Sequence, residues 1–484
     1  MTAIRRRGGS RSSANFGKPL LEFQEELGPI ARWGGQFTLA MAIVFLFQAA
    51  GPYIPNPMAY LIMIGGLSVL LLAPGRVTLR MPVSISVLLM VGWIAASLTW
   101  SDSPASTQLV LLRAVPTLIG VILIVGLMDA RHIGASLLWA VRGVVLLSLI
   151  VTVTMPSTRI HLDSQTGEPS LDGWHALFPH KNIMAPFLVF AIPTILTFDR
   201  TVLIKIGTLT GIGVLLIGSD SVTGWASAVL VFGIWVWLQF FKNLDVRNSS
   251  VFTVASVVFG IFTVGAAAAS LADIVDASGK DVTFSGRTFI WQATINAILD
   301  QPFVGFGFGG VFGFDPITPR TAAIWRDVGF TVPHAHNGIL DVILQLGLVG
   351  AGIYLLLWFS VLIGSVRMLN RQPQIAEWIL SVVLGQFFIS LSENVFLGAG
   401  WLAIIIMFRL LLLRKRGLSL DIAERPARER TPLQAAVVGV GQQIIGNPSS
   451  DAPAGSAGSE TNGNGGRGPR HGGGNGTGRG TGPR

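Results

Sequence analysis

Apolar stretches long enough to cross a lipid bilayer recur along most of the chain. A membrane-spanning helix needs about 20 predominantly apolar residues. Of the 484 residues, 51% are hydrophobic and only 12% are charged, which excludes an ordinary soluble enzyme and indicates an all-α polytopic membrane protein. About twelve stretches qualify, and they lie near residues 33–53, 58–74, 83–100, 108–128, 134–155, 183–199, 203–218, 225–241, 250–271, 338–363, 378–395 and 397–413.

The distribution of Lys and Arg orients these stretches. Loops on the cytoplasmic side of a membrane carry an excess of both residues, and this places both termini in the cytoplasm. Residues 1–32 then form a cytoplasmic segment, residues 33–416 the membrane domain, and residues 417–484 a Gly-rich tail that we expect to be disordered. The formal net charge of +9 follows from this topology, so we expect no nucleic-acid partner. Because the chain has no cysteine, disulfides and thiolate catalysis are excluded.

Two loops on the outer side are long, at residues 156–182 and 272–337. Binding and catalytic residues concentrate in connections that exceed the minimum length. The first loop ends in the segment WHALFPHKN, and the second ends in PHAHN. Together they carry the charged and imidazole groups that we consider for a site: His175, His180, Lys181, Arg287, Arg320, Arg326, His334 and His336.

His334 and His336 stand directly before the apolar run that begins near residue 338. Imidazole titrates near neutral pH, so this position suits proton transfer, metal binding or pH sensing. Asn337 can cap the following helix, and Asp341 and Gln345 continue its polar face at a spacing of four residues. The dipole of that helix disfavours a charged imidazole at His336. A neutral imidazole is what a general base requires.

The segment SGRTFIWQATINAILDQP predicts a short amphipathic helix lying on the membrane, with Ser285 or Thr288 as its cap. Arg287 then lies at the N-terminal end, where free backbone amides and a guanidinium together favour a phosphate group. The alternative is an Arg that extends to the headgroups of membrane lipids.

The next segment, VGFGFGGVFGF, contains a literal GxGxxG. That pattern indicates dinucleotide binding only between a strand and a helix of a βαβ unit, and an external loop of a membrane protein does not provide one. We interpret it as a turn-rich segment in which Gly permits close backbone packing. Its aromatic residues, Phe303, Phe306, Phe308 and Phe312, are expected in the membrane interface.

Three motifs together resemble a known family. His336-Asn337, nine residues and then Gly347-x-x-Gly350 is similar to the pattern of bacterial O-antigen ligases, while GRTFIW, PFVGFGFGGV and FPHKN look like the related O-antigen and exopolysaccharide polymerases. The resemblance implies about twelve helices in a glycosyltransferase-C-like topology. It also implies a multi-pass protein of the bacterial inner (plasma) membrane. The large external loop would contain short amphipathic helices.

The activity that this resemblance implies is transfer of an oligosaccharide from an undecaprenyl-diphosphate-linked donor to a glycan or lipid acceptor on the outer face, without metal or cofactor. Arg287 resembles the diphosphate-binding Arg of the family, and His336 its catalytic histidine. His336 would deprotonate the acceptor hydroxyl, with inversion at the sugar. The substrate site is expected to include Lys181, His180, Arg320, Arg326, His334, Asn337 and Asp341. The resemblance is also compatible with polysaccharide-assembly proteins as partners.

Three alternatives stay open at this point. The first is a secondary transporter or exporter of a polar or anionic solute. The second is a zinc enzyme that uses His334 and His336 together with His175 or His180. The third is a membrane scaffold without catalysis. The motifs also do not distinguish a polymerase from a ligase, because the sugar and the acceptor that an enzyme takes depend on the shape of its pocket.

Overall fold

The computed structural model describes residues 77–159, 161–162, 169–170, 173–243, 287–312, 317–414 and 418–422. They all belong to one compact unit that ends at Arg425. The predicted spans near 33–53, 58–74 and 250–271 lie outside the described residues. So do the segment 1–32 and the tail beyond residue 422.

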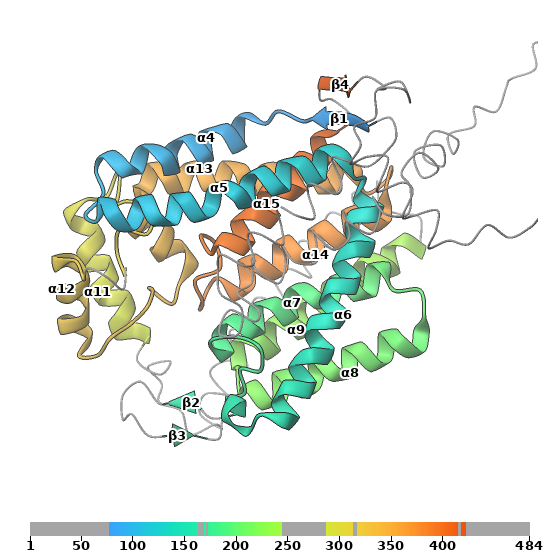
Figure 1. Cartoon of the computed structure of the whole chain (residues 1–484), viewed down its shortest axis with the longest axis horizontal. Helices are drawn as coiled ribbons and strands as arrows, with labels where there is room; N and C mark the ends of the chain where they lie inside the picture. The colour runs from blue at the N-terminus through green and yellow to red at the C-terminus, as the bar shows by residue number, and fades with distance from the viewer. Residues whose placement is uncertain are drawn as a thin grey trace, which may run out of the picture. The chain divides into compact units, whose positions relative to one another are not determined.

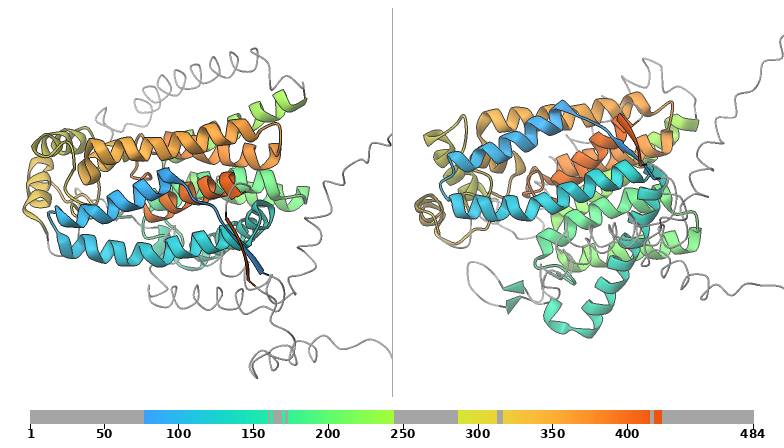
Figure 2. Two further views of the ribbon diagram at one scale, coloured as in Figure 1. Left: turned by 90° about the horizontal axis from the view of Figure 1, so that it is seen from above. Right: turned by 45° about the horizontal axis from the view of Figure 1, so that its top comes forward.

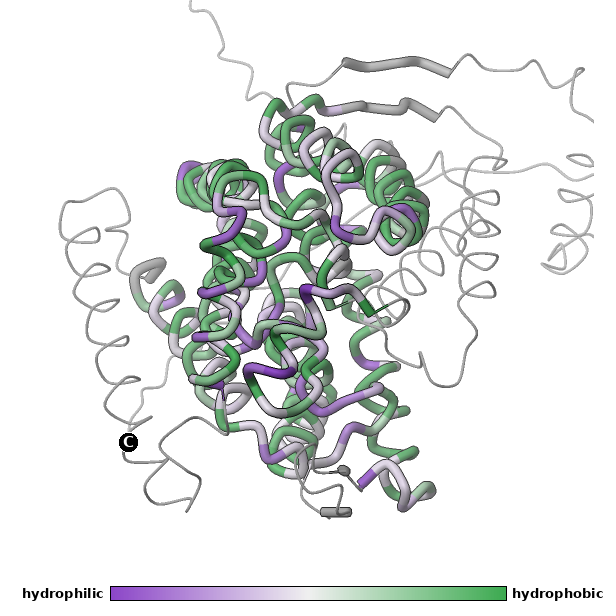
Figure 3. Tube along the Cα trace, turned by 90° about the vertical axis from the view of Figure 1, so that its left-hand side faces the viewer, coloured by the Kyte–Doolittle hydropathy of each residue, from purple (hydrophilic) through white to green (hydrophobic). Residues whose placement is uncertain are grey.

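Every predicted span within the described ranges overlaps a helix, but residues 390–395 of the span predicted at 378–395 lie in the connection after that helix ends at Ile389. Six helices are long and apolar enough to cross a membrane: α5 (Pro104–Leu127), α6 (Ala130–Thr154), α7 (Lys181–Phe198), α8 (Val202–Ser219), α9 (Val222–Asn243) and α13 (Gly338–Met368). Three more apolar helices are shorter: α4 (Ile85–Ala96), α14 (Pro373–Ile389) and α15 (Ala399–Leu413). Hydrophobic residues predominate along this helical trace (Figure 3). The multi-pass helical membrane protein is confirmed, while the total of about twelve spans and the glycosyltransferase-C-like topology stay predictions.

Four short strands accompany the helices, although the sequence indicated helices alone. Strand β1 (Val77–Met81), before α4, pairs antiparallel with β4 (Leu418–Ile422), after α15 (Figure 2). Strand β2 (His161–Leu162) pairs with β3 (Pro169–Ser170) between α6 and α7. Each ladder satisfies backbone groups where the chain leaves an apolar helix. Two one-turn helices, η1 (Ser97–Thr99) and η2 (Pro156–Arg159), lie in the connections that follow α4 and α6.

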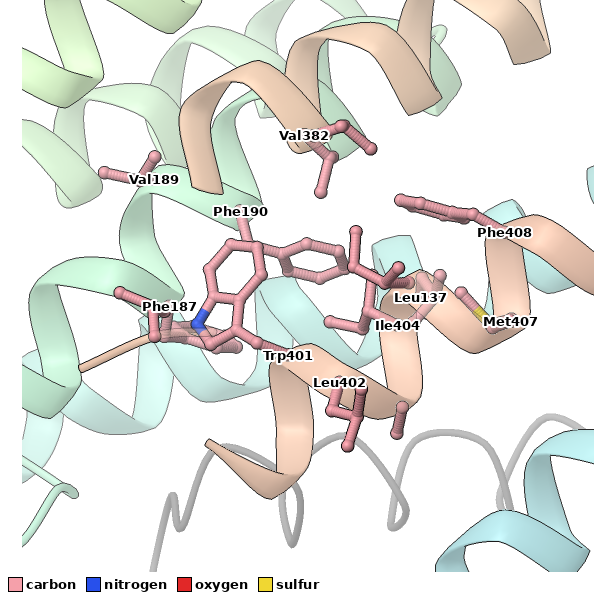
Figure 4. Close-up of a cluster of buried hydrophobic side chains, with 14 of the residues drawn as sticks. Leu137, Phe187, Val189, Phe190, Val382, Trp401, Leu402, Ile404, Met407 and Phe408 are labelled. Atoms are coloured by element: carbon pink, nitrogen blue, oxygen red, sulfur yellow. The ribbon is translucent and has the colours of Figure 1, made fainter. Parts of the chain in front are cut away.

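The interior forms around α7, which contacts α6, α8, α9 and α14. Its residues from Met184 to Leu196 are buried without a break, as expected for a helix enclosed by other helices. Figure 4 shows Phe190 of α7 beside Trp401 of α15, and the two rings meet edge to face at 6.1 Å. This packing holds α14 and α15, and therefore the connection between them, against the rest of the bundle.

Two short helices from the large loop gather where α13 begins (Figure 1). These are α11 (Arg287–Asp300) and α12 (Pro319–Val328). Helix α11 buries Ile290, Ala293 and Ala297 in a cluster that includes Ile324 of α12 and Leu344 of α13. The predicted helix and the place of Arg287 at its N-terminal end are confirmed. Its buried face packs on protein, and its contact with the membrane stays a prediction.

Helix α13 is broken at Gly347, whose φ of 69° and ψ of −178° are not helical. The break frees the carbonyl groups of Leu344 and Gln345, which accept hydrogen bonds from the amides of Phe306 (3.0 Å) and Gly307 (2.9 Å). On the other side of the break, the Leu348 amide donates to Pro302 at 2.8 Å. Residues 302–312, called the Gly-rich segment below, therefore complete the backbone hydrogen bonding of a kinked helix.

The aromatic residues of this segment are mostly inside the protein. Phe306, Phe308 and Phe312 are buried, whereas Phe303 is 66% exposed. Close backbone packing by Gly is thus confirmed, but the expected interfacial position holds at most for Phe303. The other three rings turn inward because the segment is pulled onto α13 by its backbone hydrogen bonds.

Candidate active site

His336 occupies an unusual backbone conformation just before α13. Its φ is 49°, in the left-handed region that non-glycine residues rarely adopt. Two hydrogen bonds hold it there: its amide donates to His334 Nδ1 (3.2 Å), and its carbonyl accepts from Trp291 Nε1 of α11 (3.1 Å). The His334 and His336 rings lie 4.1 Å apart between centroids. Such strain persists only where surrounding structure enforces it, often at functional sites.

Asn337 anchors this turn on both sides. Its Oδ1 accepts from the amides of Ile339 (3.0 Å) and Leu340 (3.1 Å) and so caps α13, as predicted. Its Nδ2 donates to the Leu391 carbonyl at 3.1 Å, and the next amide, of Gly338, donates to Ser390 at 2.7 Å. Residues 334–337, called the histidine turn below, are therefore attached to the end of α14 and to the residues that follow it.

Glu393, in the connection between α14 and α15, joins the two predicted catalytic residues. Its Oε1 lies 2.5 Å from Arg287 Nη2, and its Oε2 lies 3.4 Å from His336 Nδ1. The Glu393 side chain is 5% exposed, whereas those of Arg287 and His336 are 17% and 16% exposed. A buried carboxylate thus supports two groups that solvent can still reach.

Charges in the cluster stabilise one another. Burial alone would raise the pKa of Glu393, but the Arg287 charge and the neighbouring His336 outweigh it and lower the pKa to about 2. The pKa of His334 falls to about 3, first because burial disfavours its charged form and then because of the neighbouring His336. At neutral pH the cluster therefore contains a carboxylate, a guanidinium and an uncharged His334.

Asp341 lies beneath the histidine turn and is fully buried. Its Oδ1 accepts from the Ala335 amide at 3.4 Å, and its Oδ2 accepts from Gln345 Nε2 at 2.6 Å. Gln345 Oε1 in turn accepts from the amide of Gly309 at 2.8 Å. Asp341 therefore faces protein, as the cost of placing a carboxylate against lipid leads one to expect, and links the histidine turn to the Gly-rich segment.

The remaining predicted site residues lie in two places, at the start of α7 and in α12. His180 caps α7, with its Nδ1 accepting from the Asn182 amide at 3.1 Å, and it is one of the groups that lower the pKa of His334. Lys181 is the first residue of α7. Arg320 forms an ion pair with Asp300, and its Nε lies 3.8 Å from Oδ2 of Asp102. Its guanidinium also lies over the Phe306 ring. Two carboxylates therefore already neutralise the charge of Arg320. Arg326 is exposed in the last turn of α12. Roles for these residues in substrate binding stay predictions.

Glu393 was missed as a site residue by the sequence reasoning. A signal did exist, since an ionisable group within an apolar stretch is costly and usually functional. Nothing local assigned its partners, because Arg287 and His336 lie far away in the chain. Trp291 was likewise unmarked, although its indole holds the His336 carbonyl.

One group of ligand atoms in the described residues could hold a metal ion: one atom each of His334, His336 and Glu393 lie within 4.8 Å of one another. His175, a ligand candidate in the zinc alternative, instead has its Nδ1 2.7 Å from the Phe178 carbonyl oxygen. The guanidinium of Arg287 sits on the same carboxylate and repels a cation there. The donor set is compatible with a metal, but the guanidinium paired with its carboxylate opposes a cation.

Comparison with known proteins bears on the region that contains both catalytic candidates. Residues 207–355 match the family described as O-antigen ligase. This region is similar to that family. The chain is also 28% identical over 187 residues to the exopolysaccharide production protein ExoQ of Rhizobium meliloti (strain 1021). That alignment covers 35% of this chain and 41% of the relative's length.

The resemblance to O-antigen ligases and exopolysaccharide polymerases is thereby confirmed, and a glycan ligase or polymerase type of enzyme is supported. The family region includes Arg287 and His336 and ends before Glu393. The carboxylate that joins them is therefore contributed by a part of the chain outside the matched region.

Proposed function

We propose that this protein transfers an oligosaccharide from an undecaprenyl-diphosphate-linked donor to a glycan or lipid acceptor on the outer face of the bacterial inner membrane. The observation that carries the proposal is the meeting of Arg287 and His336 at Glu393. A cation and an imidazole, both partly exposed and each near the beginning of a helix, thus contact the same carboxylate.

Arg287 is suited to bind the donor diphosphate. It is the first residue of α11, where unpaired backbone amides and the helix dipole attract anions. A guanidinium can bind two phosphate oxygens at once. Charge that accumulates on the diphosphate when the sugar–oxygen bond breaks is stabilised at this position, so the leaving group needs no metal ion.

His336 is suited to act as the general base. Its Nδ1 faces Glu393, which leaves Nε2 for the acceptor. Nε2 takes the hydroxyl proton of the acceptor sugar, the hydroxyl oxygen attacks the anomeric carbon, and the electron pair of the broken bond leaves with the diphosphate. Attack from the face opposite the leaving group inverts the anomeric configuration.

The test is complementation of a deletion strain, with analysis of surface polysaccharide. We expect His336→Ala and Arg287→Ala to abolish long-chain or attached glycan while the protein remains inserted in the membrane. Arg131→Ala is the matched control, because Arg131 is an exposed Arg at the start of another helix, α6. Full activity of either site variant contradicts the proposal.

The deletion phenotype separates the two reaction types. Loss of long chains with single repeat units still attached indicates a polymerase, whereas loss of all attached glycan indicates a ligase. Accumulation of labelled solute in vesicles that contain the purified protein would instead support the transporter alternative.

A further inference from the structure

We propose that Glu393 is the positioning residue of this active site, holding the His336 ring by its Nδ1 atom so that Nε2 faces the acceptor. The inference rests on the proposed function. It adds a residue outside the region that matches O-antigen ligases.

The first argument is that Glu393 offers His336 Nδ1 a partner that the other described residues do not. This atom is buried and has no well-formed hydrogen bond among the described residues. The nearest carboxylate oxygen, Oε2 of Glu393, lies 3.4 Å away. Hydrogen bonds in active sites are often long without substrate and shorten when substrate binds. A neutral imidazole that donates from Nδ1 to a carboxylate has its lone pair on Nε2, where a base needs it.

The second argument is that Glu393 itself is fixed. Its side chain is 5% exposed, and its backbone amide donates to the Ile389 carbonyl at 3.0 Å. The neighbouring Ser392 hydroxyl bonds Thr223 of α9 at 2.8 Å. A carboxylate on such a support can orient a ring that occupies a strained backbone position.

The third argument comes from the division of the carboxylate. One oxygen lies at Arg287 and the other at His336. When a donor diphosphate engages Arg287, it competes with Glu393 for the guanidinium and frees the carboxylate to tighten on His336. Donor binding and readiness of the base would then be coupled through one side chain.

A purely structural ion pair is the competing explanation, and the kinetic constants separate the two. The assay uses full-length protein reconstituted in lipid, with the lipid-linked oligosaccharide that accumulates in the deletion strain as donor. For Glu393→Gln we expect kcat to fall at least about 10-fold. The donor KM should stay equal or decrease, because Arg287 loses an internal competitor. Glu393→Asp retains the charge and should recover part of the lost kcat.

Glu377→Gln is the matched control. Glu377 is also a buried glutamate, in α14, and bonds Gln239 Nε2 at 2.7 Å, away from the histidine turn. We expect its kinetic constants to match those of the unmodified protein.

Three outcomes would count against the inference or its basis. Unchanged kcat in Glu393→Gln, with an inactive His336→Ala, overturns the role of Glu393 and leaves the proposed function standing. A parallel loss of kcat and rise in donor KM means that Glu393 only supports Arg287 or the fold, and this also overturns it. Full activity of His336→Ala removes the proposed function itself.

Discussion

The α-carbon of Gly347 packs directly on the backbone of Phe303, so closely that a Cβ atom at this position would overlap the Phe303 carbonyl group. This contact is possible only because α13 breaks there with a positive φ. It attaches the Gly-rich segment to the helix that begins at the histidine turn.

Gly347→Ala should therefore destabilise the protein and reduce transfer activity. A non-glycine residue in this conformation costs roughly 1–3 kcal/mol, and the overlap with Phe303 adds to it. Thermal unfolding in detergent measures the effect. Gly352 lies in the same helix, and a Cβ atom there would meet no other atom within 4 Å, so Gly352→Ala should be neutral or slightly stabilising. Equal unfolding temperatures for both variants would show that the kink is dispensable.

Acidification should weaken the fold through His334. Its folded pKa of about 3 lies below the ordinary value of 6.5, so the unfolded chain binds more protons between these limits, and stability falls as the pH drops below about 6.5. His334→Asn keeps an acceptor for the His336 amide but cannot titrate. Its unfolding temperature should fall less between pH 6.5 and 5.

Glu393 contributes little in that range, because its folded pKa of about 2 and its ordinary value of 4.5 both lie below pH 5. If the unmodified protein and His334→Asn lose stability in parallel as the pH falls, His334 is not the cause.

Transfer activity should persist after metal removal. The pairing of Arg287 with Glu393 makes the group of His334, His336 and Glu393 unfavourable for a cation. Activity of reconstituted protein is measured before and after dialysis against EDTA, and bound zinc is quantified in the same samples. Loss of activity that added Zn²⁺ restores would favour the zinc alternative instead.

The side of the membrane on which the site lies can be tested with single cysteines, since the chain contains none. Thr331 is exposed just before the histidine turn, and Arg200 is exposed between α7 and α8. In spheroplasts with an intact inner membrane, Thr331→Cys should react with a membrane-impermeant maleimide. Arg200→Cys should react only after that membrane is permeabilised. The reverse pattern would place the site in the cytoplasm.

Several parts of the fold and the site were accessible from sequence because they depend on local pattern. Long apolar runs predicted helices such as α6 and α13, since each helix satisfies its own backbone groups in an apolar environment. The Asn337 cap and the position of Arg287 at a helix start followed from residues within one turn. Burial of Asp341 followed from the cost of exposing a carboxylate to lipid.

The sequence by itself therefore determined a helical membrane protein with an Arg and a His at the ends of two helices. Only the tertiary structure decided that they share Glu393, because the packing of α7 against α14 sets where the following connection lies. It also decided that Phe306 and Phe308 turn inward, since the carbonyl groups freed at Gly347 draw the Gly-rich segment onto α13. Contacts between residues distant in sequence depend on how whole helices pack, and no local pattern encodes that.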